Sequence, residues 1–577
     1  MIGENEKLVV EPETGRRASA GLRDGLGRPS SHRGGESFLW LFFCLFGLAA
    51  AVRCEHLGDV SYIFDEGFCW KMISFEPGEI WRRMPLANQP PLYFYLLWAW
   101  SKVFGHSPSA LRAMSVVFGL ASVGGAYLLA REFAGGRVRE SGADGRPVCN
   151  AGRPHPGPLP EGEGDNCPHR DAFTNERGEW AGLTAAALVA LSPLQIDWSQ
   201  HARMYALGAA LTAFSSWFLL RATRERVARR RDWALYAATA SLLLYTHYYA
   251  LFIVAAQLLY TLGWAATMVR ARLGGAAVAF AAVGASWLPW LPWFLRHRAQ
   301  VEESFWTRDF GWDQLALACF QTCAVSWREN LTNPAALFCV GALAVVLTAG
   351  MLAAHHPALR LVGVAVLTTL WGAAMASSLG RNIVSARYLV FAHLMLLCGV
   401  GVVACGLRQR AVRAAVVCGL LASSAWLCWR HAERRAACAE RPGIAQAMAY
   451  LREVHRAGEP IVVANPMLQI AAAAYATPQE QVRILSRSKS FPFYQGTAVL
   501  RDGDFITPAE LDGGTSRTLW VVDALYWTVG TYRVDLPDAW ADVAEERFPE
   551  WANAKSEIVV RRCVRRPSPS TALRRPT

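Results

Sequence analysis

The 577-residue chain is poor in charge, and it lacks the motifs of nucleotide-dependent enzymes. Charged residues make up 18% of it, against roughly 25% in soluble domains. No GxxxxGKS/T loop and no dinucleotide-binding fingerprint follows a candidate strand, so no nucleotide-binding domain is predicted. The 14 cysteines include no CxxC pair and no zinc-finger spacing, and only five of the 58 basic residues are lysines. A disulfide scaffold, a metal finger and a soluble nucleotide-dependent enzyme are therefore excluded.

Apolar sequence is abundant instead. Hydrophobic residues make up 53% of the chain, with 23 Trp. They are grouped in runs of about 16–24 residues, the length that spans a bilayer. The runs predict a polytopic α-helical membrane protein with about eleven transmembrane helices: 38–54, 112–131, 180–197, 203–221, 233–247, 249–268, 274–295, 335–353, 359–379, 388–407 and 412–429. The apolar stretch 91–104 is too short to span, and it predicts an interfacial helix in the first outer loop.

The arginines set the predicted orientation. With residues 1–37 as a disordered cytoplasmic tail, the Arg-rich loops 221–232 and 408–411 also lie in the cytoplasm, as the positive-inside rule requires. The net charge of +12 is explained by this topology, and no nucleic-acid partner is expected. Pro- and Gly-rich residues 135–178 predict a disordered cytoplasmic insertion, and residues 566–577 a disordered tail.

The chain changes character in residues 431–565. Short apolar strands near 460–464 and 482–486 alternate with helical patterns, which predicts a small α/β domain. Eleven spans place this domain on the extracytoplasmic side, while 38–430 form the transmembrane catalytic domain. Cys438 and Cys563 bracket the α/β domain, and whether they pair is left open.

Polar residues that apolar spans do not need gather in five places, all on the predicted outer face. The candidate site residues among them are Asp65 and Glu66, then Gln89, then Asp197, Gln200, His201, Arg203 and Tyr205, then His247 and Tyr248, and finally Arg381, Arg387 and Tyr388. Polar groups at membrane depth are costly and tend to be functional. We expect these loops to meet in one extracytoplasmic cavity that holds a lipid-linked substrate.

The residue types suggest roles. Asp65 is a candidate general base for an acceptor hydroxyl or amine. Glu66 could raise the pKa of Asp65, hydrogen-bond the acceptor, or share a divalent cation with Asp65. Arg203, Arg381 and Arg387 match the geometry of a phosphate leaving group, with lipid-headgroup contact as the alternative. No cofactor is required by the sequence, and the identity of any metal stays unknown.

The remaining candidates have weaker signals. His201 and His247 are candidates for binding an acceptor or a metal, although a single histidine is more often structural. Tyr248 could stack on a sugar ring or belong to an interfacial aromatic belt.

These segments also carry a family resemblance. FDEG, NQPPLYFYLLWAW, LSPLQIDWSQHARMYALGAAL, YTHYYALF and ARYLVFA resemble the bacterial family-39 glycosyltransferases. That family is similar to the dolichyl-phosphate-mannose protein mannosyltransferases and the lipid A aminoarabinose transferases, all of the GT-C fold. The resemblance implies a polyprenyl-phosphate-linked sugar donor and Asp65 as catalytic base with Glu66 beside it. Gln89 and His201 stand where related sequences commonly have His and Glu, which leaves Asp197 as the only acid in its turn.

We therefore expect a multi-pass glycosyltransferase of the bacterial inner membrane, with its active site and α/β domain on the periplasmic side. It would move a sugar from a polyprenyl-phosphate donor to a glycan, lipid or protein acceptor by inverting displacement. The alternative is a transporter or flippase for lipid-linked sugars, which predicts charges near mid-span and an internal repeat. The sequence shows no clear repeat, and its mid-span regions are nearly free of charge.

Overall fold

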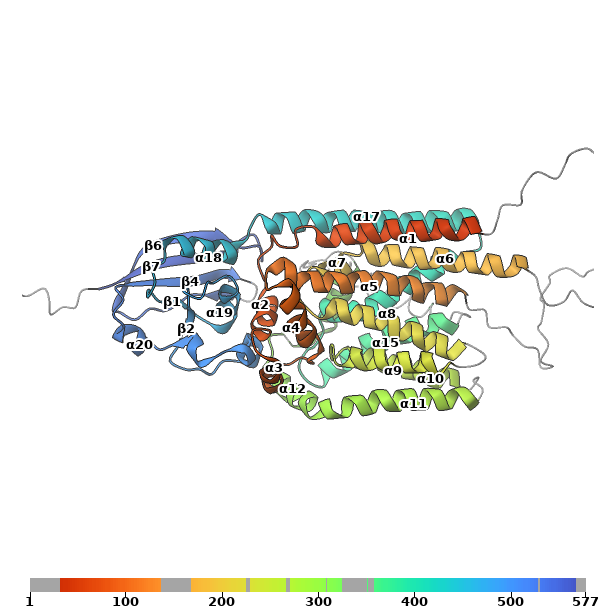
Figure 1. The fold of residues 1–577 in the computed structure, drawn as a ribbon, viewed down its shortest axis with the longest axis horizontal. Coiled ribbons are helices and arrows are strands. Elements are labelled where there is room, and N and C mark those ends of the chain that lie inside the picture. The colour runs from red at the N-terminus through yellow and green to blue at the C-terminus, as the bar shows by residue number, and fades with distance from the viewer. Residues whose placement is uncertain are drawn as a thin grey trace, which may run out of the picture.

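The computed structural model describes residues 32–135, 168–224, 229–265, 270–307, 309–323, 350, 357–527 and 530–566. It has two parts joined end to end: a bundle of long helices lying side by side, and a sheet domain beyond one end of the bundle (Figure 1). Short helices lie between the two parts (Figure 1). This arrangement confirms the predicted fold class, a polytopic helical protein with a small C-terminal α/β domain.

The long helices form the bundle. They are α1 (His32–Cys54), α5 (Pro108–Gly135), α6 (Pro168–Leu191), α8 (Tyr205–Arg224), α9 (Arg230–Leu244), α10 (Ala250–Ala265), α11 (Arg270–Trp287), α15 (Pro357–Ser378), α16 (Val390–Gly406) and α17 (Arg410–Ala439). The shorter helix α13 (Trp312–Cys323) contacts α16. Within the described ranges, six helical segments are long and apolar enough to cross a membrane. The predicted span 335–353 lies outside the described residues apart from residue 350.

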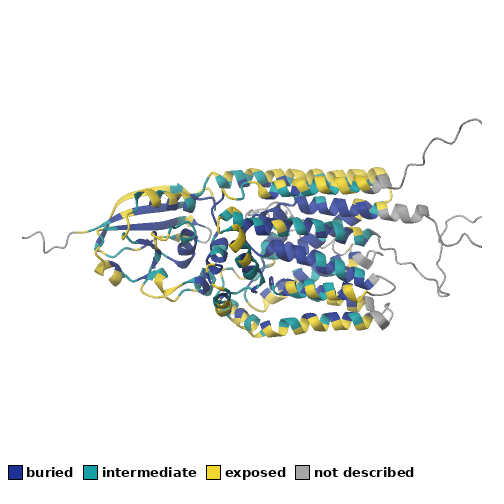
Figure 2. Cartoon of the chain, viewed as in Figure 1, coloured by how far each residue is buried: buried dark blue, intermediate teal, exposed yellow. Residues whose placement is uncertain are grey.

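The helices at the edge of the bundle show where lipid belongs. Helices α1, α11 and α17 are exposed along much of their length (Figure 2). Their exposed side chains include Trp40, Val278 and Trp426, which water would solvate poorly. Exposed apolar side chains along helices of this length mark membrane-facing sides. The chain is a membrane protein.

Several predicted boundaries are corrected. The predicted span 180–197 ends at Leu191, because Ser192 caps a separate short helix, α7 (Pro193–Ser199), by accepting the Gln195 amide. The predicted span 274–295 is divided at Trp287 by a 3-10 turn, η2 (Leu288–Trp290), before α12 (Leu291–Glu303). Proline lacks the amide that continues a helix, and Pro289 lies in this turn.

The ends of the predicted disordered segments are also corrected. Helix α1 begins at His32, inside the predicted tail 1–37, and α6 begins at Pro168, inside the predicted insertion 135–178. Most of both segments lies outside the described residues.

A layer of short elements lies between the bundle and the sheet domain (Figure 1). It contains α2 (Phe64–Met72), α3 (Pro77–Arg83), η1 (Met84–Leu86) and α4 (Leu92–Phe104). Helix α4 has 13 residues, or about 20 Å of length, against about 30 Å for the bilayer core. The prediction that 91–104 is a helix too short to span is confirmed.

The C-terminal domain is a seven-stranded sheet with the order β3-β2-β1-β4-β7-β6, and β5 pairs with β4. Strands β1 to β4 run parallel along this path, whereas β6 and β7 are antiparallel additions. The strands are β1 (Ile461–Val463), β2 (Val482–Leu485), β3 (Phe505–Ile506), β4 (Thr518–Trp527), β5 (Gly530–Tyr532), β6 (Trp540–Pro549) and β7 (Glu557–Arg565). The helices are α18 (Gly443–Val454), α19 (Pro466–Ala473), α20 (Pro508–Gly513), η4 (Phe493–Gln495), η5 (Thr497–Val499) and η6 (Asp502–Asp504).

The two parts share buried side chains. Ile470, Ala498 and Val499 of the sheet domain belong to the same hydrophobic cluster as the bundle core. Arg83 at the end of α3 also donates from Nη1 to the carbonyls of Ala498 and Leu500, at 2.9 and 3.0 Å. The C-terminal domain is therefore packed on the layer that contains α2.

The bracketing cysteines do not form a disulfide. Cys563 is buried in β7, and its thiol donates to Asp542 Oδ1 at 3.1 Å. Cys438 lies near the end of α17, where it packs against Val60, Ile63 and Trp551.

Candidate active site

Helix α2 places the two acidic residues at the end of the bundle that is next to the C-terminal domain (Figure 1). Asp65 and Glu66 lie in its first turn, where carboxylates favour the helix dipole, and Glu66 Oε2 accepts the Ile63 amide at 3.2 Å. Successive residues of an α-helix point about 100° apart, because a turn has 3.6 residues. The two carboxylates consequently contact different partners.

Glu66 is fully buried and fully bonded. Arg112 of α5 donates from Nε to Oε1 and from Nη2 to Oε2, both at 2.8 Å. The Ala202 amide donates to Oε1 at 2.8 Å. Burial alone would raise the pKa of Glu66, but the charge and hydrogen bonds of Arg112 lower it to about 2. Glu66 is therefore ionised at neutral pH, and it joins α2 to α5 and to the segment after α7.

Asp65 lies between two arginines and retains solvent contact. Arg387 Nη1 is 2.8 Å from Oδ2, and Arg203 Nη2 is 4.0 Å from Oδ1. The carboxylate is 23% exposed, whereas the Glu66 side chain is inaccessible. Burial raises the pKa of Asp65, but the two guanidinium groups outweigh it and hold the pKa below its ordinary value. Asp65 is thus an ionised carboxylate with one side open to a substrate.

The arginines beside Asp65 are held by their own contacts. Arg203 is 2% exposed and donates to the Asp65 carbonyl at 3.2 Å and to the Cys69 thiol at 3.4 Å. Arg387 lies in η3 (Ala386–Leu389), directly before α16, and donates to the Tyr388 hydroxyl at 3.3 Å. These contacts aim both guanidinium groups at the same carboxylate.

Aromatic rings line the same region. The His247 ring lies 5.2 Å from that of Tyr388 and 5.5 Å from that of Tyr205, between centroids. His247 Nδ1 accepts the Tyr249 amide at 3.1 Å, so its proton is assigned to Nε2. Burial, then the charges of Arg203 and Arg387, lower the pKa of His247 to about 3. His247 is therefore a neutral donor. In the structure, the turns containing Arg203, His247 and Arg387 lie close together on the side of Asp65.

Other predicted site residues face away from Asp65. Gln200 donates from Nε2 to the carbonyls of Val52 and Glu55, at 3.2 and 3.1 Å, and its Oε1 lies 3.2 Å from His431 Nε2. It thereby ties the turn after α7 to α1 and α17. Gln200 supports the fold in this position.

His201 and Asp197 form a buried layer behind Glu66. His201 Nδ1 donates to the backbone carbonyl of Asp197 at 2.7 Å. The same nitrogen is 4.0 Å from Oδ1 of the Asp197 side chain. Burial lowers the pKa of His201.

Tyr248 and Arg381 also point elsewhere. The Tyr248 hydroxyl donates to His297 Nδ1 at 2.5 Å and accepts from Trp290 Nε1 at 3.2 Å, which joins it to η2 and α12. Arg381 is 41% exposed and lies 3.7 Å from Asp309. Gln89 is half-buried in the loop before α4. Within the described contacts, none of Tyr248, Arg381 and Gln89 is joined to Asp65.

Three important residues were not predicted. Arg112 begins a predicted span at its outer end, where the positive-inside rule disfavours arginine, and that exception was an available signal. Lys71 is buried at the end of α2, and charged lysine is rarely buried without a partner. Trp306 is 43% exposed, and the Arg387 guanidinium lies 4.9 Å from its ring centroid. No motif surrounds Trp306.

The predicted sharing of a divalent cation by Asp65 and Glu66 does not fit the geometry. The oxygens of Glu66 already accept hydrogen bonds from Arg112, Ala202 and Ile63, so a shared cation would have to displace Arg112. Across the described ranges, no group of three His, Cys, Asp or Glu side chains could hold a metal ion.

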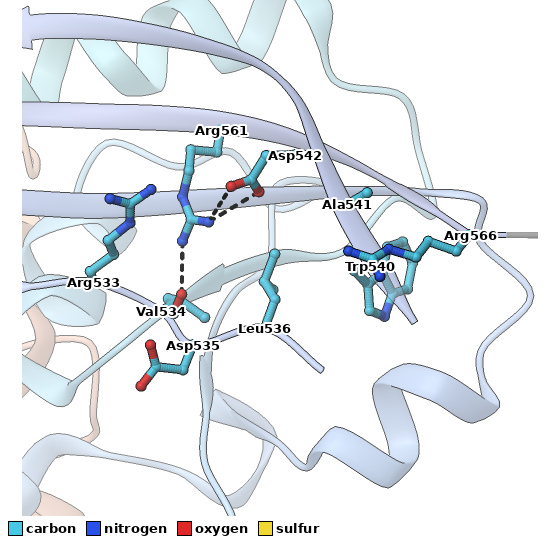
Figure 3. A pocket seen from close by; sticks show the side chains of 9 residues that line it. All are labelled: Arg533, Val534, Asp535, Leu536, Trp540, Ala541, Asp542, Arg561 and Arg566. Carbon is cyan, nitrogen blue, oxygen red and sulfur yellow. Dashed lines mark hydrogen bonds and ion pairs between the residues drawn. The ribbon is translucent and has the colours of Figure 1, made fainter. Parts of the chain in front are cut away.

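A separate hollow of about 460 Å³ opens on the C-terminal domain (Figure 3). Arg561 crosses it and donates to Asp523, Asp542 and the Val534 carbonyl. The carboxylates of Asp523 and Asp542 thus pair with its charge. Its lining residues are Arg533, Val534, Asp535, Leu536, Trp540, Ala541, Asp542, Arg561 and Arg566.

Comparison with solved structures finds several similar proteins. ArnT from Cupriavidus metallidurans bound to undecaprenyl phosphate aligns with 92% of this chain and 98% of its own, at 12% identity and a TM-score of 0.51. Its apo state aligns with 91% of this chain and 98% of its own, at 12% identity and a TM-score of 0.53. The archaeal oligosaccharyltransferase AglB from Archaeoglobus fulgidus aligns with 85% of this chain and 70% of its own, at 12% identity and a TM-score of 0.45.

The alignment with ArnT runs over nearly the whole chain, C-terminal domain included, and confirms the predicted GT-C-like fold. No family model and no curated protein matches the chain. The resemblance to family 39 in particular stays a prediction.

Proposed function

We propose that this protein is a membrane glycosyltransferase that transfers a sugar from a polyprenyl-phosphate donor to an acceptor at the outer face of a bacterial inner membrane. The observation that carries the proposal is the placement of Asp65, partly open, between Arg387 and Arg203. A fold shared with ArnT, one structure of which binds undecaprenyl phosphate, supports a lipid-phosphate donor.

The charges of the site suit a phosphodiester. Arg112, Arg203 and Arg387 face two carboxylates, Asp65 and Glu66, which leaves an excess of one positive charge in this group. A polyprenyl-phosphate sugar is a phosphodiester with one negative charge, and guanidinium matches phosphate geometry. We assign Arg203 and Arg387 to the donor phosphate, with the lipid chain among the spans.

The chemistry follows from this arrangement. The phosphate competes with Asp65 for Arg203 and Arg387, which restores part of the ordinary basicity of the carboxylate. Asp65 then accepts the proton of the acceptor hydroxyl or amine as that atom attacks the anomeric carbon. The bond from the anomeric carbon to the phosphate oxygen breaks, and lipid phosphate leaves with the bonding electrons. One attack from the opposite side inverts the anomeric carbon.

The surrounding side chains orient the sugar. His247 Nε2–H is a neutral donor for a sugar or phosphate oxygen, and Tyr205 and Tyr388 flank it. Glu66 holds the backbone of α2 through Arg112 and makes no contact with the substrate.

The test is transfer by the purified protein supplied with radiolabelled polyprenyl-phosphate sugars. Asp65→Asn should lower kcat by about 10²-fold or more while donor binding, measured by equilibrium dialysis, persists. Asp59→Asn is the matched control, because Asp59 lies in the segment just before α2 and its side chain is 61% exposed. Full transfer by Asp65→Asn would exclude Asp65 as the base, and donor movement without a product would favour a flippase.

A further inference from the structure

The C-terminal domain contacts the helix that contains Asp65 at three levels. Just before α2 begins, the Tyr62 amide donates to the Tyr475 hydroxyl of the C-terminal domain at 2.8 Å. At its middle, Gly67 packs on α19. At the C-terminal end of α2, the Lys71 side chain bonds to Gln469 and Asp504 of the domain.

The end of the helix makes a charged contact. Lys71 is 6% exposed, and its Nζ donates to Asp504 Oδ2 at 2.7 Å and to Gln469 Oε1 at 2.8 Å. Gln469 in turn donates from Nε2 to Asp504 Oδ1 at 3.2 Å, which holds the two acceptors together. Among the lysines in the described ranges, Lys71 alone is buried. A buried ammonium group requires such partners. The end of α2 is therefore held against the C-terminal domain by the bonds of Lys71 to Asp504 and Gln469.

The middle of the helix makes a steric contact. A Cβ on Gly67 would lie 3.1 Å from Ile470 Cγ2 and 3.3 Å from the Ile470 carbonyl oxygen. The backbone of α19 therefore approaches α2 directly, one turn before Lys71. Only a residue without a side chain allows this approach without displacing α19.

The other side of the same helix faces the bundle through the Glu66–Arg112 pair and the Asp65–Arg387 pair. Helix α2 has nine residues, and isolated helices of that length are marginal in water. The position of α2 is consequently fixed by the helical bundle on one side and the C-terminal domain on the other.

We propose that the C-terminal domain positions the catalytic helix, and that Lys71 is a positioning residue acting through Asp504 and Gln469. The inference rests on the proposed role of Asp65. The α2 clamp, defined here as Tyr475, Ile470, Gln469 and Asp504, holds Asp65 in line with the acceptor. Loss of the clamp should therefore reduce turnover more than donor binding, because Arg203 and Arg387 belong to the bundle.

The experiment uses the full-length protein and Lys71→Met. We expect kcat to fall about tenfold or more, because small displacements of a catalytic group have effects of this size, with donor KM within about twofold. Hydrogen exchange should accelerate in a peptide covering residues 64–72 and stay unchanged in α5. Lys489→Met is the matched control, since Lys489 pairs with Asp502 in the same domain but at 59% and 94% exposure, and exposed pairs contribute little.

A second variant keeps the proposal testable if Lys71→Met fails to fold. Gly67→Ala changes no charge and separates α2 from α19, so it should accelerate exchange in 64–72 and lower kcat. Wild-type exchange and kcat in both Lys71→Met and Gly67→Ala would overturn the proposal, as would an equal effect of Lys489→Met. Asp65→Asn should lower kcat by about 10²-fold or more while the contacts of Lys71 and Gly67 with the domain stay in place. If the wild-type protein transfers no sugar, the proposed function fails, while the exchange measurements still decide whether the domain holds α2.

Discussion

Replacing Glu66 by glutamine should destabilise the protein strongly, although Glu66 lies beside the proposed base. The substitution keeps the shape but leaves the Arg112 charge buried without its anion, and both side chains are inaccessible. Breaking a buried pair on one side costs about 3–5 kcal/mol. The fall of the Glu66 pKa from 4.5 to about 2 corresponds to a similar amount, about 3 kcal/mol.

The pH dependence has a defined sign. Because the folded-state pKa lies below the unfolded value, the stabilisation by Glu66 is fully present above pH 4.5 and is lost as the pH falls from 4.5 towards 2. Glu66→Gln should therefore flatten this part of the stability curve as well as lower the whole curve.

The assay is denaturant-induced unfolding in detergent micelles, followed by tryptophan fluorescence. Glu79→Gln is the control, since Glu79 pairs with Arg83 at 2.9 Å near the surface and should cost less than about 1 kcal/mol. Arg112→Met should lower the free energy of unfolding less in the Glu66→Gln background than it does in the wild-type protein. A loss below about 1 kcal/mol for Glu66→Gln would refute the assignment of a structural ion pair.

Three further outcomes are expected. Gly182→Ala in α6 should cost about 1–3 kcal/mol of unfolding free energy, because its Cβ would lie within 3.0 Å of a neighbouring backbone and ring, whereas Gly124→Ala, which meets nothing within 4 Å, should be neutral or stabilising in the same titration. The depressed pKa of His247 means that acidification from pH 6.5 towards 3 protonates the unfolded chain first and destabilises the fold; His247→Gln should lessen this loss in thermal melts between pH 6.5 and 5. Alkylation under denaturing, non-reducing conditions should label both Cys438 and Cys563, as mass spectrometry can show; a disulfide-linked peptide pair would contradict the structure.

The sequence predicted what depends on local pattern. Apolar runs located the helical bundle, the 13-residue α4 was identified by its length, and alternating strands and helices indicated the α/β domain. The helix breaks at Ser192 and at Pro289 depended on capping and proline chemistry that a hydropathy pattern does not register.

Side-chain direction decides which of the candidate residues lie beside Asp65. Asp65 and Arg387 are 322 positions apart and meet because both follow the outer end of a helix, which topology predicts. Gln200 and Arg203 are three positions apart, yet Gln200 turns towards α1 and α17 while Arg203 turns towards Asp65. The segment between them is irregular, so no period specifies which side chain enters the cavity. Arg112 was hidden for a different reason, since its partner Glu66 lies 46 positions away on a separate helix.

The two adjacent carboxylates have different electrostatic roles in the proposed reaction: one keeps its charge and the other loses it. Glu66 stays ionised because Arg112 holds it, so it contributes a constant charge. Asp65 changes charge: it takes up the acceptor proton and becomes neutral, while the phosphodiester becomes a monoester with a second negative charge. The charge facing Arg203 and Arg387 is therefore the same before and after transfer, and no unpaired charge appears in a buried site, where it would be costly. A base distant from the phosphate could not maintain that balance, which is why the proton acceptor and the phosphate site have to be adjacent.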